Sequence, residues 1–504
     1  MSSSRPIASL RTAFVLGLTS CSDSAGDADK AEAVKPGVLL VTLDTVRADR
    51  LRVYGNARIR TPALDRLCEE GSVFENAFTA IPSTLPSHCT LMTGTYPSRH
   101  GVHDNGVYFL ENSAQTLAEV LKLYGFATAA FVASFVLDRR FGLSQGFDVY
   151  DDAMEEALVQ GDPDRIRQDP KLSEEQKKWF ARTAGRFQRR ASSVTARAVE
   201  WVEELDGRPF FLWVHYFDAH QPYQPPPPWD RAYDPGYEGE LDGDMNTFFK
   251  VAAKNRWTPR TLPAAEKDHM VALYDGEIST VDESLGTLLD ALRKKGRWSS
   301  TLVVVVADHG EGFGEHEQIW EHNWEIFDET MRVPLIVRDP EEPSVRRVTE
   351  LARTLDVAPT ILDWLELTVP ASCEGCSLLP AMEGRSSPRI EDALLEARRK
   401  VQVHSDGQTP LLGLRTATHK LILTLDLDER VIRRQLFDLD QDRGESRPPD
   451  SDSSEQLETR LREIERASSG DRSALPVRSL EDIDIEGLES IGYIEPKKEP
   501  SPRR

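Results

Sequence analysis

The sequence predicts an α/β fold with a doubly wound, mainly parallel sheet. Continuous apolar runs such as residues 38–43 are typical of strands buried on both faces of such a sheet. Segments with helical apolar spacing separate these runs, as a βα alternation requires. Polar clusters follow several of the runs directly, which places them at the carboxyl ends of strands, where such sheets bind their ligands.

Composition narrows the class of protein. The chain has 504 residues, of which 39% are hydrophobic, and 61 Lys and Arg stand against 84 Asp and Glu for a net charge of −23. A length of this order allows two to four domains or one large α/β core. The acidic excess argues against nucleic acid as a partner, because phosphate binding requires a basic face. Five cysteines are too few for a disulfide framework.

Residues 1–35 are expected to be a signal and linker outside the fold. Arg5 and Arg11 precede the short apolar run 12–18, and Cys21 follows it. This order resembles a bacterial lipoprotein signal, in which Cys21 would become the lipid-carrying N-terminus. We therefore expect an exported lipoprotein of the periplasm or cell envelope. Its membrane contact would be through the lipid alone, since no other run approaches the ~18 apolar residues of a spanning helix.

The elements of the body follow from local patterns. Thr61 and Pro62 are typical of a helix start, and Gly71 follows that helix. Helices are also predicted over 116–123 and 268–292, and strands over 126–132, 210–215, 302–306 and 333–337.

We assign residues 36–385 to one catalytic domain. The charge-rich stretch near 155–200 and the Pro- and Gly-rich stretch near 221–263 interrupt the alternation and are interpreted as insertions. Residues 386–440, with short strands in 412–425, form a small C-terminal α+β subdomain, and 441–504 form a polar tail.

The polar clusters suggest a metal-assisted nucleophilic site. Asp44, Asp308 and His309 offer oxygen and nitrogen donors for a divalent cation. Thr84, at a helix start marked by Pro86, is the candidate fourth ligand and attacking group. An aliphatic alcohol is barely ionised at neutral pH, and coordination lowers its pKa by several units.

Other polar residues are candidates for the substrate. His220 and His322 are candidates for protonating the leaving oxygen. Candidate substrate-binding residues are Arg47, His88 and Asn105. The alternatives are that Thr84 only caps its helix and that the two histidines are packed structurally, and His215 is interpreted as a structural residue or one that supports a ligand.

Many ordered matches show a resemblance to the sulfatase branch of the alkaline phosphatase superfamily. It covers roughly residues 37–440, and the matching segments are 61–67, 86–94, 274–278, 308–311, 332–336 and 436–439. The resemblance implies an alkaline phosphatase-like fold with a metal-dependent site. It also implies hydrolysis of a sulfate, phosphate or phosphonate ester of a small molecule, glycan or lipid.

The departures from the sulfatase pattern concern the nucleophile. Thr84 stands where sulfatases carry the Cys or Ser that becomes formylglycine, and His88 stands where they carry Arg. Threonine cannot form that aldehyde, and Cys89 lies five positions away, so no formylglycine is expected. Thr45 replaces the second of two metal-binding aspartates.

Threonine at this place resembles lipoteichoic acid synthases, phosphoethanolamine transferases and nucleotide pyrophosphatases. That resemblance implies a covalent Thr84 ester and one cation, Ca, Zn or Mn, held by Asp44, Thr84, Asp308 and His309. A second cation would need further ligands, for which Asp218, His220 and His322 are the candidates.

Two functional alternatives stay open. One is a phosphoryl-group transferase of the phosphoethanolamine or glycerophosphate type. The other is a catalytically silent member that binds a glycan.

Cys373 and Cys376 have the spacing of a redox pair or half a zinc site, and we favour a structural bridge or two free thiols.

Overall fold

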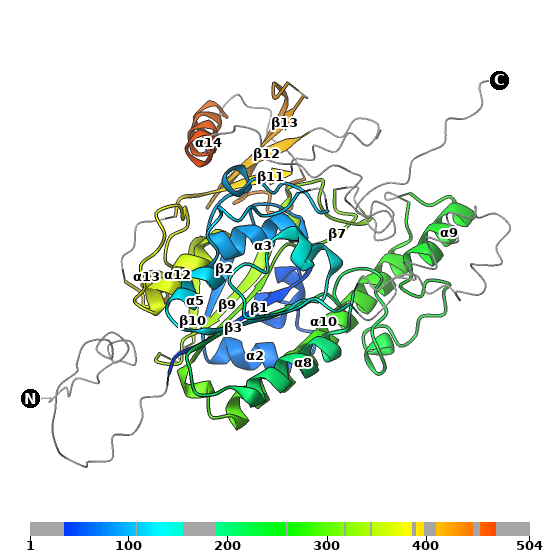
Figure 1. Cartoon of the computed structure of the whole chain (residues 1–504). Coiled ribbons are helices and arrows are strands. Elements are labelled where there is room, and N and C mark those ends of the chain that lie inside the picture. The colour runs from blue at the N-terminus through cyan, green and yellow to red at the C-terminus, as the bar shows by residue number, and fades with distance from the viewer. Residues whose placement is uncertain are drawn as a thin grey trace, which may run out of the picture.

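A computed structural model describes the chain over residues 35–106, 108–154, 188–258, 261–316, 319–342, 345–385, 390–397, 410–426, 428–446 and 454–469. The expected signal with Cys21, much of the first insertion and most of the tail lie outside these residues. None of the helices described is long and apolar enough to cross a membrane. Figure 1 shows a central sheet between two helical layers, with a smaller sheet beside it.

The central sheet has eight strands in the order β10-β2-β9-β6-β1-β5-β3-β4. The pairs from β6 through β4 are parallel, whereas β9 runs antiparallel to both of its neighbours. The predicted α/β class with a mainly parallel sheet is therefore confirmed. The strands are β1 Gly37–Leu43, β2 Ser72–Phe78, β3 Ala127–Phe131, β4 Val149–Asp151, β5 Phe210–Tyr216, β6 Thr301–Ala307, β9 Arg332–Arg338 and β10 Arg346–Arg353.

Helices cover both faces of this sheet (Figure 1). On one face lie α2 Pro62–Glu69, α8 Ala191–Glu204 and α10 Ala264–Lys294. On the other lie α3 Thr84–Thr93, α5 Leu117–Leu123, α12 Val357–Trp364 and α13 Leu379–Met382. The short helices α4 Pro97–His100 and α11 Asp328–Met331, the insertion helix α9 Met245–Asn255 and the two-stranded β7 Gly312–Phe313 and β8 Ile319–Glu321 complete the catalytic domain.

The starts of two helices are capped in different ways, one by neighbouring residues and the other by a residue distant in the sequence. Thr116 and Glu119 form a reciprocal capping box at the start of α5. Thr61 precedes α2 as predicted, but its side chain makes no capping hydrogen bond. Instead the Asp282 carboxylate on α10 accepts the N–H groups of Ala63 and Leu64 at 3.0 and 2.8 Å. The sequence pattern located this helix, and a distant residue caps it.

Two segments differ from the expected division. Residues 191–200, expected within the first insertion, begin α8, which packs on β5 and α10 and so belongs to a core layer. In the expected tail, α14 Glu455–Ser468 packs on β11 Asp392–Ala397 and β12 Leu411–Thr416. These two strands continue with β13 His419–Leu425 and β14 Val431–Asp438 in an antiparallel sheet. Leu461 of α14 is fully buried there, so the C-terminal α+β subdomain extends beyond residue 440.

Candidate active site

The site begins where the parallel strands β1 and β6 end together. Leu43 is in register with Ala307, so Asp44 and Asp308 follow as neighbours at the same sheet edge. Thr45 then takes a left-handed backbone conformation with φ 56°, which is rare for a β-branched residue. Its N–H donates to Asp308 Oδ1 at 3.2 Å, and the His309 N–H donates to the same oxygen at 2.8 Å. This arrangement fixes Asp308 by one carboxylate oxygen.

Thr84 is the first residue of α3 and is fully buried. Its Oγ1 lies 3.4 Å from His309 Nε2. His309 Nδ1 donates to the Gly310 carbonyl at 2.9 Å, so Nε2 is the ring nitrogen that faces Thr84. Asn105 Oδ1 accepts the Leu85 N–H at 2.8 Å. The hydroxyl, the imidazole and the amide therefore converge at the helix start.

Two buried carboxylate oxygens give this place the character of a cation site. Asp44 Oδ1 and Asp308 Oδ2 are buried and accept no hydrogen bond within the described part of the chain. The ligand atoms of Asp44, Asp308 and His309 all lie within 4.8 Å of one another. Unsatisfied buried carboxylate oxygens are costly, and a divalent cation would satisfy both. The residues present therefore fit the metal that the sulfatase resemblance implies.

The electrostatics agree with this interpretation. Burial raises the pKa of the Asp44 carboxyl to about 7, although His309 and a hydrogen bond from Thr84 act in the opposite direction. Burial and the neighbouring Asp44 charge also raise the pKa of Asp308. Two carboxylates held together away from water repel each other, and a bound cation removes that repulsion.

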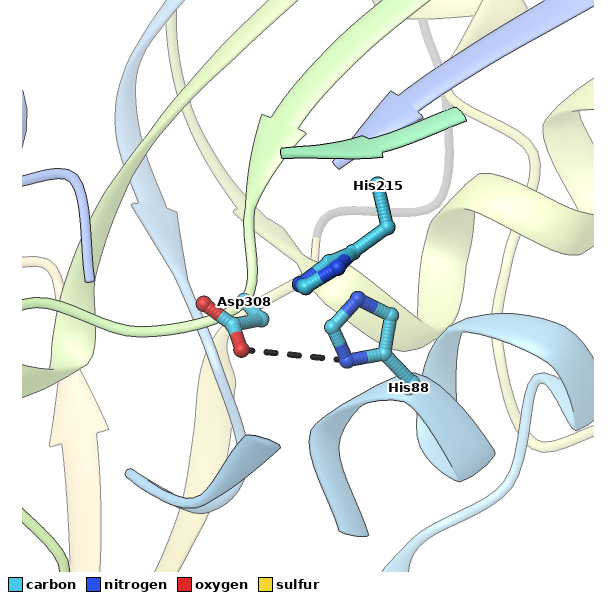
Figure 2. Close-up of side chains that lie close together, drawn as sticks. All are labelled: His88, His215 and Asp308. Atoms are coloured by element: carbon cyan, nitrogen blue, oxygen red, sulfur yellow. Dashed lines mark ion pairs between the residues drawn. The ribbon is translucent and has the colours of Figure 1, made fainter. Parts of the chain in front are cut away.

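A second group of possible ligands, His88, His215 and Asp308, shares Asp308 with the first, and Figure 2 shows its three side chains. His88 Nδ1 donates to the Thr84 carbonyl at 2.7 Å, and its Nε2 lies 3.0 Å from the Thr42 hydroxyl. His215 Nδ1 accepts the Ala133 N–H at 3.3 Å, so its Nε2 donates to Asp44 Oδ2 at 3.2 Å.

All four ring nitrogens of His88 and His215 therefore have hydrogen-bond partners. Burial lowers the pKa of His88 to about 3 and that of His215 to about 4, so both rings are neutral at pH 7. This group needs no cation. His215 orients the presumed ligand Asp44, and His88 fixes the Thr84 backbone instead of reaching a substrate as expected.

The two remaining histidines lie next to the presumed ligands. The His322 ring centroid is 4.4 Å from that of His309 and 5.1 Å from that of His220. His220 stacks on Phe217 at 4.3 Å and donates from Nδ1 to the Gln221 carbonyl at 2.8 Å. Burial, with repulsion from His322, lowers the pKa of His220 to about 3. The structure thus brings together His220, His322 and the Thr84 region, as the sequence predicts.

Arg47 and Asp218 lie differently from what was expected. The Arg47 guanidinium is engaged by Asp49 at 2.8 Å, by Glu315 at 2.9 Å and by the Glu311 carbonyl at 3.0 Å. Four of its five N–H groups donate to these residues, so Arg47 joins the end of β1 to the loop around β7 and directs most of its donors to acidic groups of the protein.

Asp218 Oδ2 accepts the Ala191 N–H at 2.7 Å and therefore faces the start of α8. This position gives no support to a second cation held by Asp218. Asn105, by contrast, keeps a buried Nδ2 donor with no hydrogen-bond partner among the described residues.

Sequence reasoning assigned no role to Glu311, although it stands in the segment Asp308-His309-Gly310-Glu311. Its buried carboxylate contacts His322 Nδ1 at 3.3 Å. Gly310, the residue before Glu311, permits a close approach of two backbone segments, since a Cβ there would lie 2.0 Å from the Glu329 carbonyl oxygen. The position of Glu311, two residues after the candidate metal ligand His309, is the sequence feature that could have identified it as a site residue.

Cys373 and Cys376 are free thiols in the structure. The Cys373 thiol donates to the Gly94 carbonyl at 3.4 Å, at the C-terminal end of α3. Of the two forms favoured from the sequence, the structure has the unbridged one.

Comparison with known proteins identifies the family to which the chain belongs. The model of the family described as "Sulfatase" matches residues 36–367, about two thirds of its length. The chain belongs to the sulfatase family. A second model, "N-sulphoglucosamine sulphohydrolase, C-terminal", matches residues 314–466 of this sulfatase-family protein and spans the C-terminal sheet and α14. Membership makes the protein a hydrolase of ester bonds.

Individual relatives are similar over most of their length. The multifunctional alkaline phosphatase superfamily protein PehA of Trinickia caryophylli is 28% identical over 414 residues, 70% of this chain and 78% of that protein. An arylsulfatase of Clostridium perfringens is 27% identical over 395 residues, 70% of this chain and 80% of its own. The phosphonate monoester hydrolase of Agrobacterium radiobacter superposes with a TM-score of 0.63 at 22% identity, covering 86% of this chain and 95% of that structure. The alkaline phosphatase-like fold is thereby confirmed.

Proposed function

We propose that this sulfatase-family protein hydrolyses a sulfate, phosphate or phosphonate ester with Thr84 as nucleophile and one divalent cation. The observation that carries the proposal is the meeting of Thr84 Oγ1 with His309 Nε2, 3.4 Å apart, beside the open oxygens of Asp44 and Asp308. The relatives named as an arylsulfatase and as a multifunctional alkaline phosphatase superfamily protein support the sulfate and the phosphate ester among these three.

The cation would be held by Asp44, Thr84, Asp308 and His309, and would stabilise the alkoxide form of the Thr84 hydroxyl at neutral pH. Thr84 Oγ1 attacks the phosphorus or sulfur atom, so that a bond to Thr84 forms as the ester bond breaks. Asn105 Nδ2 is placed at the same helix start to donate to an oxygen of the reacting group.

The leaving oxygen keeps the electron pair of the broken bond and needs a proton. His322 and His220 lie beside His309 and are the groups that supply it. Water then attacks the Thr84 ester, gives a proton back to the histidine and releases free Thr84. The buried carboxylates and rings exclude bulk water from this chemistry.

The decisive experiment compares the purified protein with Thr84→Ala and Thr84→Ser on aryl phosphate, phosphodiester, phosphonate and sulfate esters. Each protein is loaded in turn with Zn, Mn or Ca. We expect Thr84→Ala to lose about 10³-fold or more in kcat, while Thr84→Ser keeps measurable turnover. Equal turnover by Thr84→Ala and the unmodified protein would refute the nucleophile.

The same preparations test the alternatives. A Thr84 adduct that persists in intact-mass spectra and is released only by an added alcohol would show a phosphoryl-group transferase. No turnover of any ester, together with retained affinity for a sulfated or phosphorylated glycan, would show a silent binding protein.

We also propose that the protein is an exported, lipid-anchored member of the cell envelope. The support is the basic, apolar and Cys21 order at the start of the sequence. Cys21→Ala should move the protein from the membrane fraction to the soluble fraction. Unchanged membrane attachment of Cys21→Ala would refute the anchor.

A further inference from the structure

Glu311 is a carboxylate surrounded by hydrogen-bond donors. The Tyr223 hydroxyl donates to Oε2 at 3.2 Å, and the Gly312 N–H donates to Oε1 at 3.3 Å. His322 Nδ1 lies 3.3 Å from the same Oε1. The two donors are arranged as an ionised carboxylate needs them, and such a carboxylate accepts from His322 as well. The proton between Glu311 and His322 therefore belongs to His322 Nδ1.

The hairpin of β7 and β8 brings these two residues together. Glu311 immediately precedes β7 and His322 immediately follows β8, and Gly312 pairs with Glu321 between them. The backbone on both sides of His322 is left-handed, with φ 55° at Trp320 and φ 78° at Asn323. A bulky residue in this conformation is strained and persists only where packing holds it.

Aromatic side chains pack around Trp320 and keep its backbone in this conformation. The Trp320 side chain is fully buried, and its ring centroid lies 5.3 Å from Phe313, 5.8 Å from Tyr223 and 6.2 Å from Phe248. Tyr223 and Phe248 come from the stretch 221–263 that was interpreted as an insertion. This stretch therefore anchors Trp320 and also donates to Glu311.

We propose that Glu311 is the positioning residue for His322. It holds the Nδ1–H of the ring and orients Nε2 toward the reacting ester, so that in the protonated ring Nε2–H gives its proton to the leaving oxygen and the ring returns to the neutral Nδ1–H form. This inference rests on the proposed hydrolase function, in which His322 gives a proton to the leaving oxygen and takes one from water in the second step. Glu311 itself neither forms nor breaks a bond in either step.

The kinetic test varies the leaving group. A 2,4-dinitrophenyl ester needs little proton donation, whereas a phenyl ester needs much, and general acid catalysis contributes about 10²- to 10⁴-fold. We expect Glu311→Leu to slow the phenyl ester about 100-fold and the dinitrophenyl ester less than about 10-fold. Glu311→Gln keeps an acceptor oxygen and should restore most of the phenyl ester rate.

Glu315→Gln is the matched control. Glu315 is a carboxylate on the same loop that pairs with Arg47 and not with His322. We expect this variant to change both esters by the same factor. If Glu311→Leu also slows both esters equally, Glu311 has only a structural role and the proposal is overturned.

A spectroscopic readout separates failure of this inference from failure of the proposed function. In the metal-free, ¹⁵N-histidine-labelled protein, His322 is assigned by comparison with His322→Gln. We expect its Nδ1 to carry the proton in the unmodified protein and in Glu311→Gln, and to lose that preference in Glu311→Leu. An unchanged His322 tautomer in Glu311→Leu would overturn the inference whether or not the protein turns over any ester. Inactivity on every ester with the expected tautomer would refute only the hydrolase function.

Discussion

Two pairs of buried histidines lie near Asp308, and they differ in the groups that their ring nitrogens contact. His88 and His215 have backbone or side-chain partners at every ring nitrogen. His309 and His322 each have Nδ1 fixed by a partner, with Nε2 of His309 directed to Thr84. Burial is nearly the same in all four. The identity of the partners, and not burial, separates the two pairs: His309 Nε2 faces the candidate nucleophile Thr84, whereas the His88 and His215 rings contact backbone groups, Thr42 and Asp44.

We expect the largest effect from Asp308, the residue that belongs to both groups of possible metal ligands. Asp308→Asn keeps the shape of the side chain but removes a negative charge from the presumed cation site. We expect loss of bound metal and a fall in kcat/KM of about 10³-fold or more. Metal analysis of the purified variant measures the loss of bound metal, and ester hydrolysis with saturating metal measures the fall in kcat/KM. Normal metal content in Asp308→Asn would show that the cation lies elsewhere.

The next effect is a dependence of metal affinity on pH. In the metal-free protein the pKa of Asp44 is about 7, because burial outweighs the influence of His309. Asp44 must lose its proton to bind a cation, so affinity rises with pH up to about 7 and is lost as pH falls. One competing proton predicts an about 50-fold weaker Kd at pH 5 than at pH 7. Zinc titrations at both pH values measure the change, and equal Kd values would contradict it.

His215 should have an intermediate effect through its hydrogen bond to Asp44 Oδ2. A residue that orients a ligand typically changes metal affinity by about 10- to 100-fold. We expect His215→Gln to weaken zinc binding within that range without abolishing it. Calorimetric titration of the folded variant measures the change. A complete loss of binding would mean that His215 is itself a ligand.

His88 should have the smallest effect on the metal and a visible effect on stability. His88→Leu leaves the Thr84 carbonyl without its donor and the Thr42 hydroxyl without its partner ring. We expect the free energy of unfolding to fall by about 1–3 kcal/mol. Urea unfolding measures this loss, and zinc titration should show a smaller change than in His215→Gln. Weaker zinc binding without a loss of stability would instead support a cation in the group of Figure 2.

The sequence predicted the fold wherever the pattern is local. Strands β1, β5 and β6 were recognisable because strands buried on both faces need uninterrupted apolar residues. Strand β10 was not predicted, because its exposed Arg, Thr and Glu residues at the sheet edge give neither a continuous apolar run nor a regular alternation. The antiparallel direction of β9 could not be predicted either, since strand direction depends on the connections and not on the strand's own residues.

In the site, too, residues marked by a local sequence pattern were predictable, whereas contacts between distant segments were not. Asp44, Asp308 and His309 were predictable because they follow strands that end at one edge of the sheet. The role of Arg47 was not predictable, because its partner Glu315 lies on a distant loop, as its 2.9 Å contact shows. Glu311 was visible in the sequence, but its function depends on the β7 and β8 pairing that places it against His322.

The meeting of β1 and β6 also has a consequence for folding. Thr45 and Asp308, which hydrogen-bond at this edge, are 263 residues apart in the sequence. A cation held by Asp44 and Asp308 would therefore cross-link distant parts of the chain and bind only the folded state. The stability of the protein would then depend on metal concentration by mass action. A truncated chain that ends before β6 would lack Asp308 and His309 and so could not form this cation site.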